Sequence, residues 1–441
     1  MIGVLLSLAI GVALGRGKDT ERTVDAAIPL SDIRVVVVAH SQGELSILPT
    51  PAGQPARAEL RLGASGSGSL AEKAFLRDFR LSLETVDGRL VVRTEMPVPE
   101  SKPPELSFVA SLRLWLPRDL PVEAENLYGR LHVEGRDARV QARSRLGPLE
   151  IRGVRGDLEL SVDYDHAHIE DIVGNVHLEA NSEEVVVRQV QGTVTIVNKF
   201  GEVRVEDVQG RAKIENRKGS TRVTRVRDGV DLTSPFGAVI GRELGGASVI
   251  RSNTSRIELE RCPGSVTVEH RHGEVVLRSI GGDVEVTGAF IPTTIRDLGG
   301  NLRLITTESD LDVAGVAGVA EIEGQTGSIR IRDVRGNLEA HGQGGLLEVV
   351  YPTWPDSVST IVLENRSSPL ELYLPDDADV ALELRSTLGV VESRFPGLTV
   401  RKDGQIATGE QTLGSGRSKA RATSVGAVLQ VLRSTERDEK K

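Results

Sequence analysis

Cysteine is nearly missing from this sequence, in which Cys262 stands alone among 441 residues. A single cysteine cannot form a disulfide within the chain, and it cannot supply the sulfur ligands of a cysteine-based zinc site. Cysteine content therefore says little about the compartment in which the protein works.

Aromatic side chains are also scarce, and basic residues are fewer than acidic ones. The chain has 7 Phe, 4 Tyr and 2 Trp, which leave little bulk to fill a wide globular core, whereas its 47 glycines and many β-branched residues suit a thin core of small side chains. The 54 basic residues are outnumbered by 63 acidic ones, giving a formal charge of -9. Mild acidity without a basic stripe argues against nucleic acid as a partner.

No apolar run at the amino terminus is long enough to span a membrane. The run from Ile2 to Leu14 has 13 residues, fewer than the roughly 20 that a bilayer requires. Its length suits the core of a signal peptide, but no basic residue precedes it, so a buried strand or a start codon that omits a basic leader is the alternative. We expect residues 1–23 to be a signal or membrane-anchor segment of a protein exported to the periplasm or cell surface of a bacterium.

What the sequence does contain is a repeat with a period of nine residues. The stretch "GTVTIVNKFGEVRVEDVQG", Gly192 to Gly210, states it twice, and the register holds without insertion for 25 positions from 129 to 345. Glycine occupies 18 of these positions: 129, 147, 156, 174, 192, 201, 210, 219, 237, 246, 264, 273, 282, 300, 318, 327, 336 and 345. The others are Ala138, Asp165, Glu183, Asp228, Ser255, Ile291 and Ser309.

Alternate nine-residue units differ, so the true repeat is 18 residues. One class is apolar at offsets two, four and seven from the glycine position, as at Val203, Val205 and Val208. The other class is apolar at offsets two and four, with a small or polar residue such as Asn198 at six. Alternation over four or five residues is typical of strands, and a glycine at each restart suits a tight turn. The pattern predicts an all-β fold, a parallel β-solenoid (β-helix) with two strand-turn units per coil.

Outward positions support parallel stacking in register. At offset five of the first class, residues 18 apart nearly alternate in charge, beginning with Arg152, Glu170, Arg188 and Glu206. Such side chains would lie about 4.8 Å apart on adjacent coils, where opposite charges attract and like charges repel.

The flanking regions are expected to cap the solenoid, because open strand edges invite aggregation. Residues 24–128 contain short strands and a hairpin around Asp87 and Gly88, and are predicted to form an amino-terminal β cap before the repeats at 129–345. Larger side chains, including Tyr351 and Trp354, appear in residues 346–433, the predicted carboxy-terminal β cap. Residues 434–441 form a charged tail.

Three stretches carry a family resemblance: "DVQGRAKIENRKGSTRVTRV", "DVRGNLEAHGQGG" and "ENRSSPLELYLPDDADVALELRSTLGVV". They resemble the bacterial putative-adhesin family of unknown function with β-strand repeats, which is related to the head domain of putative autotransporter adhesins. The likeness covers roughly Val35 to Arg433 and includes no catalytic motif. It implies a parallel β-solenoid, often behind a membrane segment or signal.

We interpret the chain as a non-catalytic solenoid of the bacterial envelope, an adhesin-like scaffold or binding surface for protein or polysaccharide, without a cofactor. The turns never lengthen across the 25 units, so no long loops are expected to wall a catalytic cleft. Two alternatives stay open. One is a β-helix protein that binds or cleaves carbohydrate along one face, and the other is a self-assembling, filament-like protein.

The stretch "DYDHAHIED" is the strongest candidate for a metal site. His166 and His168 are two residues apart and are expected to point outward on one strand, with Asp165 and Asp171 at the adjoining turns. Imidazole and carboxylate together can hold a divalent metal. The competing interpretation, which we favour, is a solvated coil that happens to be rich in histidine.

Overall fold

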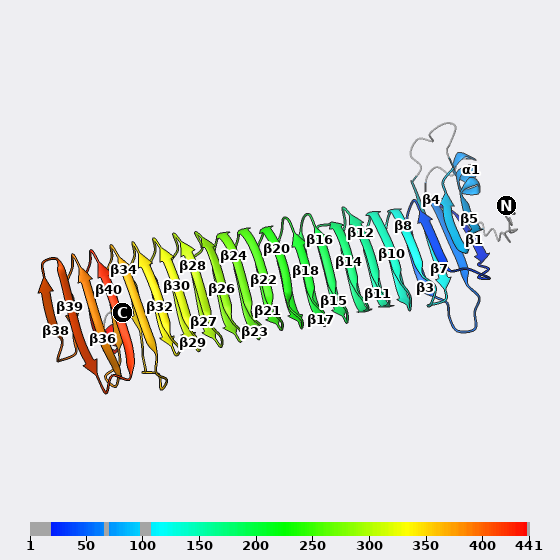
Figure 1. The fold of residues 1–441 in the computed structure, drawn as a ribbon. Helices are drawn as coiled ribbons and strands as arrows, with labels where there is room; N and C mark the ends of the chain where they lie inside the picture. The colour runs from blue at the N-terminus through cyan, green and yellow to red at the C-terminus, as the bar shows by residue number, and fades with distance from the viewer. Residues whose placement is uncertain (1–18, 66–69, 98–106, 439–441) are drawn as a thin grey trace. The chain divides into compact units, whose positions relative to one another are not determined.

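The computed structural model describes residues 19–65, 70–97 and 107–438 (Figure 1). Most of the predicted signal or anchor segment and the last three residues of the charged tail lie outside these ranges. Neither helix in the described ranges has the length and hydropathy to cross a membrane. The chain divides into two compact units, Met1–Asn216 and Arg217–Lys441.

Unit 1 consists of two sheets, named A and B, between which consecutive strands of the coils alternate. Sheet A contains β1 (Asp19–Ala27), β3 (Glu44–Pro49), β4 (Arg57–Ser65), β7 (Ser107–Leu116), β9 (Leu131–Arg136), β11 (Leu149–Arg155), β13 (Ala167–Val173), β15 (Glu184–Val190) and β17 (Glu202–Val208). Sheet B contains β2 (Val35–His40), β5 (Arg80–Val86), β6 (Arg89–Glu95), β8 (Val122–Tyr128), β10 (Val140–Leu146), β12 (Leu158–Asp163), β14 (Val176–Asn181), β16 (Val194–Asn198) and β18 (Ala212–Asn216). Helix α1 (Leu70–Asp78) contacts β1 and β4.

Unit 2 has the same two-sheet construction. Its sheet A contains β19 (Thr221–Val226), β21 (Val239–Leu244), β23 (Ile257–Cys262), β25 (Val275–Ile280), β27 (Thr293–Leu298), β29 (Leu311–Val316), β31 (Ile329–Val334), β33 (Leu347–Val350), β35 (Leu370–Leu374), β37 (Val391–Ser393) and β41 (Leu429–Arg433). Its sheet B contains β20 (Val230–Phe236), β22 (Ser248–Thr254), β24 (Val266–His272), β26 (Val284–Ala289), β28 (Leu302–Thr307), β30 (Ala320–Gln325), β32 (Leu338–Gln343), β34 (Thr360–Arg366), β36 (Val380–Thr387), β38 (Thr399–Asp403), β39 (Ile406–Leu413) and β40 (Ser418–Val425). Helix α2 (Thr435–Asp438) follows β41.

The predicted β-solenoid is confirmed in both units, with parallel strands stacked at a spacing of 18 residues. In unit 1, Ala167 pairs with Leu149 on one side and with Val185 on the other. In unit 2, Ile257 and Val275 pair in the same way. Opposite charges also stack as expected, since the side chains of Arg188 and Glu206 lie 3.4 Å apart. The coil spacing begins earlier than Gly129, because β8 already pairs in register with β10.

The apolar residue at offset seven owes its inward position to a bend in each sheet A strand. The residue before it has a positive φ throughout the repeats, as at Asp171 (57°), Ser279 (55°) and Asp297 (58°). A left-handed residue interrupts the alternation of the strand, so Ile172 points inward at an odd offset and is fully buried. A column of left-handed residues, mostly not glycine, is therefore part of the coil.

The register glycines serve two purposes rather than the single one predicted. At the turns that follow sheet B, some are left-handed, as at Gly129, where φ is 98°. At the turns after both sheets, the coils also approach too closely for a side chain: a Cβ on Gly192, after sheet A, would lie 2.2 Å from the carbonyl oxygen of Gly174, and a Cβ on Gly129, after sheet B, would lie 2.4 Å from that of Gly43. Where Asp165 or Ile291 replaces the glycine after sheet B, the preceding residue is left-handed instead.

The polar residue at offset six lies near the end of a sheet B strand, where its side chain caps the following turn. Asn126 is fully buried, and its amide donates to the carbonyl oxygens of Gly43, Gly129 and Arg130 at 2.8 to 3.1 Å. His40 of β2 lies opposite Asn126 of β8 in the strand register and occupies the equivalent position on its own coil. Its Nδ1 lies 2.9 Å from Thr94 Oγ1. Buried backbone groups need partners, so these side chains complete turns that the strands cannot.

Each terminal region contains a coil inserted between two others. In unit 1, β2 and β3 lie between the coil of β6 and β7 and the coil of β8 and β9. In unit 2, β40 and β41 lie between the coil of β34 and β35 and the coil of β36 and β37. The predicted hairpin at Asp87 and Gly88 is present as β5 and β6. Coils thus continue into both predicted caps.

Candidate functional site

A shallow groove of about 430 Å³ crosses the outer face of sheet B in unit 1. It runs over β2, β8, β10, β12 and β14, which neighbour one another through parallel pairing. The inserted β2 contributes the small side chains of Val37 and Ala39 to one end of the groove.

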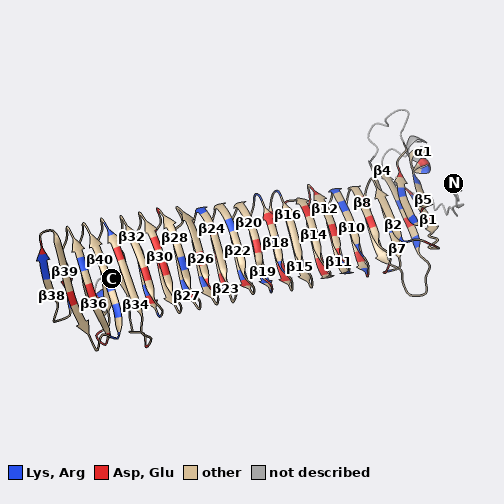
Figure 2. Ribbon diagram, viewed as in Figure 1, with Lys and Arg blue, Asp and Glu red and all other residues tan. Residues whose placement is uncertain are grey.

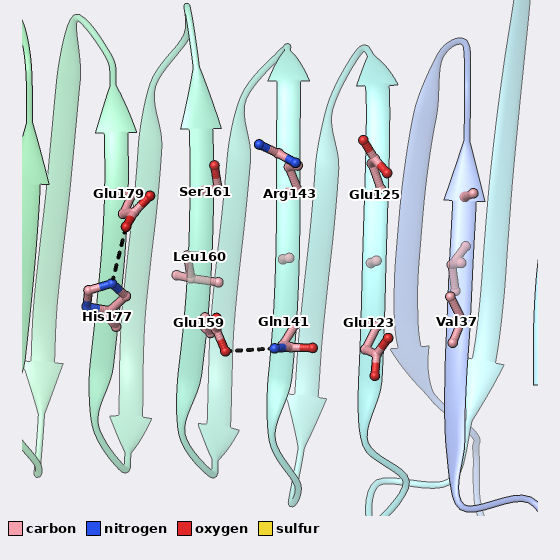
Figure 3. A pocket seen from close by; sticks show the side chains of 14 residues that line it. Val37, Glu123, Glu125, Gln141, Arg143, Glu159, Leu160, Ser161, His177 and Glu179 are labelled. Atoms are coloured by element: carbon pink, nitrogen blue, oxygen red, sulfur yellow. Dashed lines mark hydrogen bonds and ion pairs between the residues drawn. The ribbon is translucent and has the colours of Figure 1, made fainter. Parts of the chain in front are cut away.

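The groove is lined by two rows of side chains that lie on alternate outward positions of the strands (Figure 3). One row consists of Val37, Glu123, Gln141, Glu159 and His177. The second row consists of Ala39, Glu125, Arg143, Ser161 and Glu179. Because parallel strands lie about 4.8 Å apart, each row offers a regular series of polar groups.

Most carboxylates of the groove are already paired. Glu123 lies 2.6 Å from Arg89, and Glu125 lies 3.7 Å from Arg145. Glu179 lies 3.8 Å from His177, the contact drawn as a dashed line in Figure 3. The two ion pairs with arginine are exposed, so each contributes at most about 1 kcal/mol to stability.

Glu159 lies near the middle of the first row. Gln141 Nε2 donates to its Oε2 at 2.7 Å, and Arg139 donates to the same oxygen. These hydrogen bonds, that of Gln141 first and that of Arg139 second, lower the pKa of Glu159. A carboxylate held ionised in this way suits binding of a polar ligand and is poorly suited to act as a general acid.

Arg143 is the exposed cation of the second row, between Glu125 and Ser161 on adjacent coils. Within the described ranges we find no ion pair to its guanidinium. The groove therefore offers both hydrogen-bond donors and acceptors on a flat, solvent-accessible surface. Charges of both signs are interspersed over the strands of each unit (Figure 2).

The four candidate metal ligands lie on one coil of unit 1 but do not form a cluster. His166 precedes β13, and its Nδ1 lies 2.7 Å from Asp165 Oδ1. His168 lies on the outer face of β13, 3.9 Å from Glu170. Asp171 occupies the column of left-handed residues, which accounts for its place in the strand. In the described part of the chain, no group of three or more His, Cys, Asp or Glu side chains is arranged to hold a metal ion.

Exposed aromatic side chains were not singled out by the sequence analysis. In unit 1, Tyr128, Tyr164 and Phe200 are 43%, 71% and 49% exposed. They occupy equivalent positions of the repeat where strands of sheet B end, since Tyr128 is the last residue of β8 and Tyr164 and Phe200 lie in the turns after β12 and β16. The signal that could have revealed them is their spacing of 36 residues in the sequence.

Comparisons with known proteins add little to this geometry. No family model and no curated protein matches the chain. Among solved structures, a putative cell adhesion protein from Clostridium sporogenes aligns with 94% of this chain and 100% of its own length. The identity is 7% and the TM-score is 0.19, so this similarity supports no conclusion about the chain.

Proposed function

We propose that the chain is a non-catalytic, adhesin-like binding scaffold of the bacterial envelope, with an outer surface that binds protein or polysaccharide. The observation that carries the proposal is the groove of unit 1, where outward side chains are repeated in register on five neighbouring strands. A surface of this kind can bind an extended ligand through many weak contacts that recur from coil to coil.

A carbohydrate-cleaving β-helix is the second candidate, because Glu123, Glu125, Glu159 and Glu179 line the same groove. Hydrolysis of a glycosidic bond requires one carboxyl group to be protonated as the general acid, usually through a raised pKa. The lowered pKa of Glu159 and the arginine partners of Glu123 and Glu125 favour binding over cleavage.

The test is to apply the purified chain to immobilised envelope polysaccharides and proteins, and to measure both bound protein and released sugar. We expect saturable binding without release of reducing ends. Weaker binding by Arg143→Glu, which adds a negative charge to the groove, would support the groove as a contact surface. Release of sugar fragments that Glu159→Gln abolishes would establish the enzyme instead.

Export is tested separately, by fractionating cells and locating the mature amino terminus by mass spectrometry. We expect the chain in the periplasm or at the cell surface, with residues 1–23 removed or retained in the membrane. Recovery in the cytoplasm with Met1 intact would contradict the envelope location.

A further inference from the structure

The exposed aromatic residues of unit 1 form a row along one edge of the coils. The turns that follow β8, β10, β12, β14 and β16 lie along the same edge of the unit (Figure 1). Adjacent turns are joined by backbone hydrogen bonds, from Gly129 N–H to the carbonyl of Leu146 (2.8 Å) and from Tyr164 N–H to that of Asn181 (2.9 Å). Residues 18 apart in this row are therefore neighbours in space.

The row alternates between aromatic and other side chains. Tyr128, Tyr164 and Phe200 occupy every second coil, with Leu146 and Ser182 between them. Two coils of parallel strands correspond to about 9.6 Å, so the aromatic side chains recur with that period along the edge. The chain has only 7 Phe and 4 Tyr, and core packing does not explain three of them at exposed turns.

We propose that this row binds an extended β-1,4-linked glycan, with each aromatic ring stacked on the face of every second sugar. Successive sugars of such a chain are turned over relative to one another, so one face recurs once per disaccharide. That repeat is close to the two-coil spacing of the rings. The flat, apolar face of a pyranose ring packs well against an aromatic ring.

The polar side chains beside the rings suit a neutral, hydroxylated ligand rather than a polyanion. Asp165 and His166 directly follow Tyr164 and offer a hydrogen-bond acceptor and a ring nitrogen beside the row, whereas Arg130, two residues after Tyr128, is engaged by Glu44 and Glu150. The His166 and Asp165 side chains are 48% and 36% exposed and can reach sugar hydroxyls. The histidine-rich stretch thus contributes to a sugar-binding edge.

This inference rests on the proposed function and names its ligand class. The test is calorimetric titration of the full chain with β-1,4-linked oligosaccharides of glucose or N-acetylglucosamine, from disaccharide to hexasaccharide. Affinity should rise with length as two and then three rings are engaged, and α-1,4-linked glucose oligosaccharides should bind more weakly. Each ring replaced by alanine, at Tyr128, Tyr164 or Phe200, should lower the affinity for the hexasaccharide about fivefold.

Two variants serve as controls for the spacing. Val109→Ala removes an exposed apolar side chain from β7, on the other sheet of the unit, and should leave affinity unchanged. The exchange Leu146→Tyr with Tyr164→Leu keeps three rings but breaks their two-coil period, and should weaken binding as much as Tyr164→Ala does. Circular dichroism of each variant establishes that it is folded.

Wild-type affinity in the exchange variant, or in the triple alanine variant, would overturn the inference. If the wild-type chain binds another envelope polysaccharide or a protein but ignores β-1,4-linked oligosaccharides, the inference fails and the proposed function stands. If it binds none of these ligands, both fail.

Discussion

Substitutions at Ser279 test the column of left-handed residues in sheet A. Ser279 has a φ of 55° and lies in β25, between Arg261 (53°) and Asp297 (58°) of the neighbouring coils. A left-handed conformation costs an L-residue about 1–2 kcal/mol, whereas glycine adopts it freely. Glycine also loses about 0.5–1 kcal/mol through its greater entropy in the unfolded chain. Ser279→Gly should therefore stabilise the fold by about 0.5–1 kcal/mol.

Valine at Ser279 should act in the opposite direction. A β-branched side chain is poorly compatible with a positive φ, so Ser279→Val should destabilise by about 1 kcal/mol or more. Thr294, on the outer face of the next strand β27, lacks a positive φ and provides the matched control. There glycine should destabilise by about 0.5–1 kcal/mol, and valine should be nearly neutral.

Equilibrium urea unfolding of the four variants, followed by circular dichroism, measures these differences. Hydrogen exchange of peptides from β25 and β27 shows whether each change in stability arises in the coil that carries the substitution. The reasoning would be refuted if glycine destabilised the chain equally at both positions, or if valine were tolerated at Ser279 as well as at Thr294.

Three further predictions concern the core, pH and metal. Val187 is fully buried between Ile169 and Val205 of the adjacent coils, so Val187→Asp should lower the free energy of unfolding by several kcal/mol. Val197 is exposed, so Val197→Asp should lower it by less than about 1 kcal/mol in urea unfolding. Equal losses at the two positions would contradict the register. Burial lowers the pKa of His40 from 6.5 to about 4, so the unfolded chain takes up the proton at a higher pH than the folded chain does. The free energy of unfolding should therefore fall by up to about 3 kcal/mol as the pH drops through this range. Most of this loss should disappear in His40→Asn, and an unchanged pH dependence in that variant would rule out His40 as its source. Removal of divalent metal by a chelator should leave the melting temperature unchanged; a fall that zinc restores would make His166 and His168 metal ligands.

The sequence was sufficient to predict the coil because its information is local. Each glycine position and the apolar offsets around it recur every 18 residues, and stacking in register follows from that period alone. The bend in sheet A was already implied by the apolar residue at offset seven, as at Val208, because a regular strand would bury offset six. The bend residues vary from Asp171 to Ser279, so residue type alone did not mark them.

The inserted coils and the groove could not be predicted because they depend on pairing between distant segments. Val37 lies beside Glu123 only because β2 is placed between β6 and β8, and neither strand carries a local signal for that partner. The polar side chains of Glu159 and Gln141 were visible in the sequence, but their hydrogen bond depends on the stacking of β10 on β12. The same holds for the row of exposed aromatic residues. Their spacing of 36 residues predicts a row in space only when the ends of the sheet B strands are known to lie along one edge.

The central claim, that the 18-residue coil is the unit of this protein, is tested most directly by two internal deletions in unit 1. Removing Gly192 to Gln209 takes out one whole coil, with β16 and β17, and joins β15 of sheet A to β18 of sheet B, so strands of the two sheets still alternate. Removing Gly201 to Gln209 takes out half a coil and places sheet B sequence where sheet A sequence belongs. Melting curves followed by circular dichroism should show cooperative folding for the whole-coil deletion and misfolding or aggregation for the half-coil deletion. Equal folding of the two variants, or loss of folding in the whole-coil deletion alone, would contradict the account.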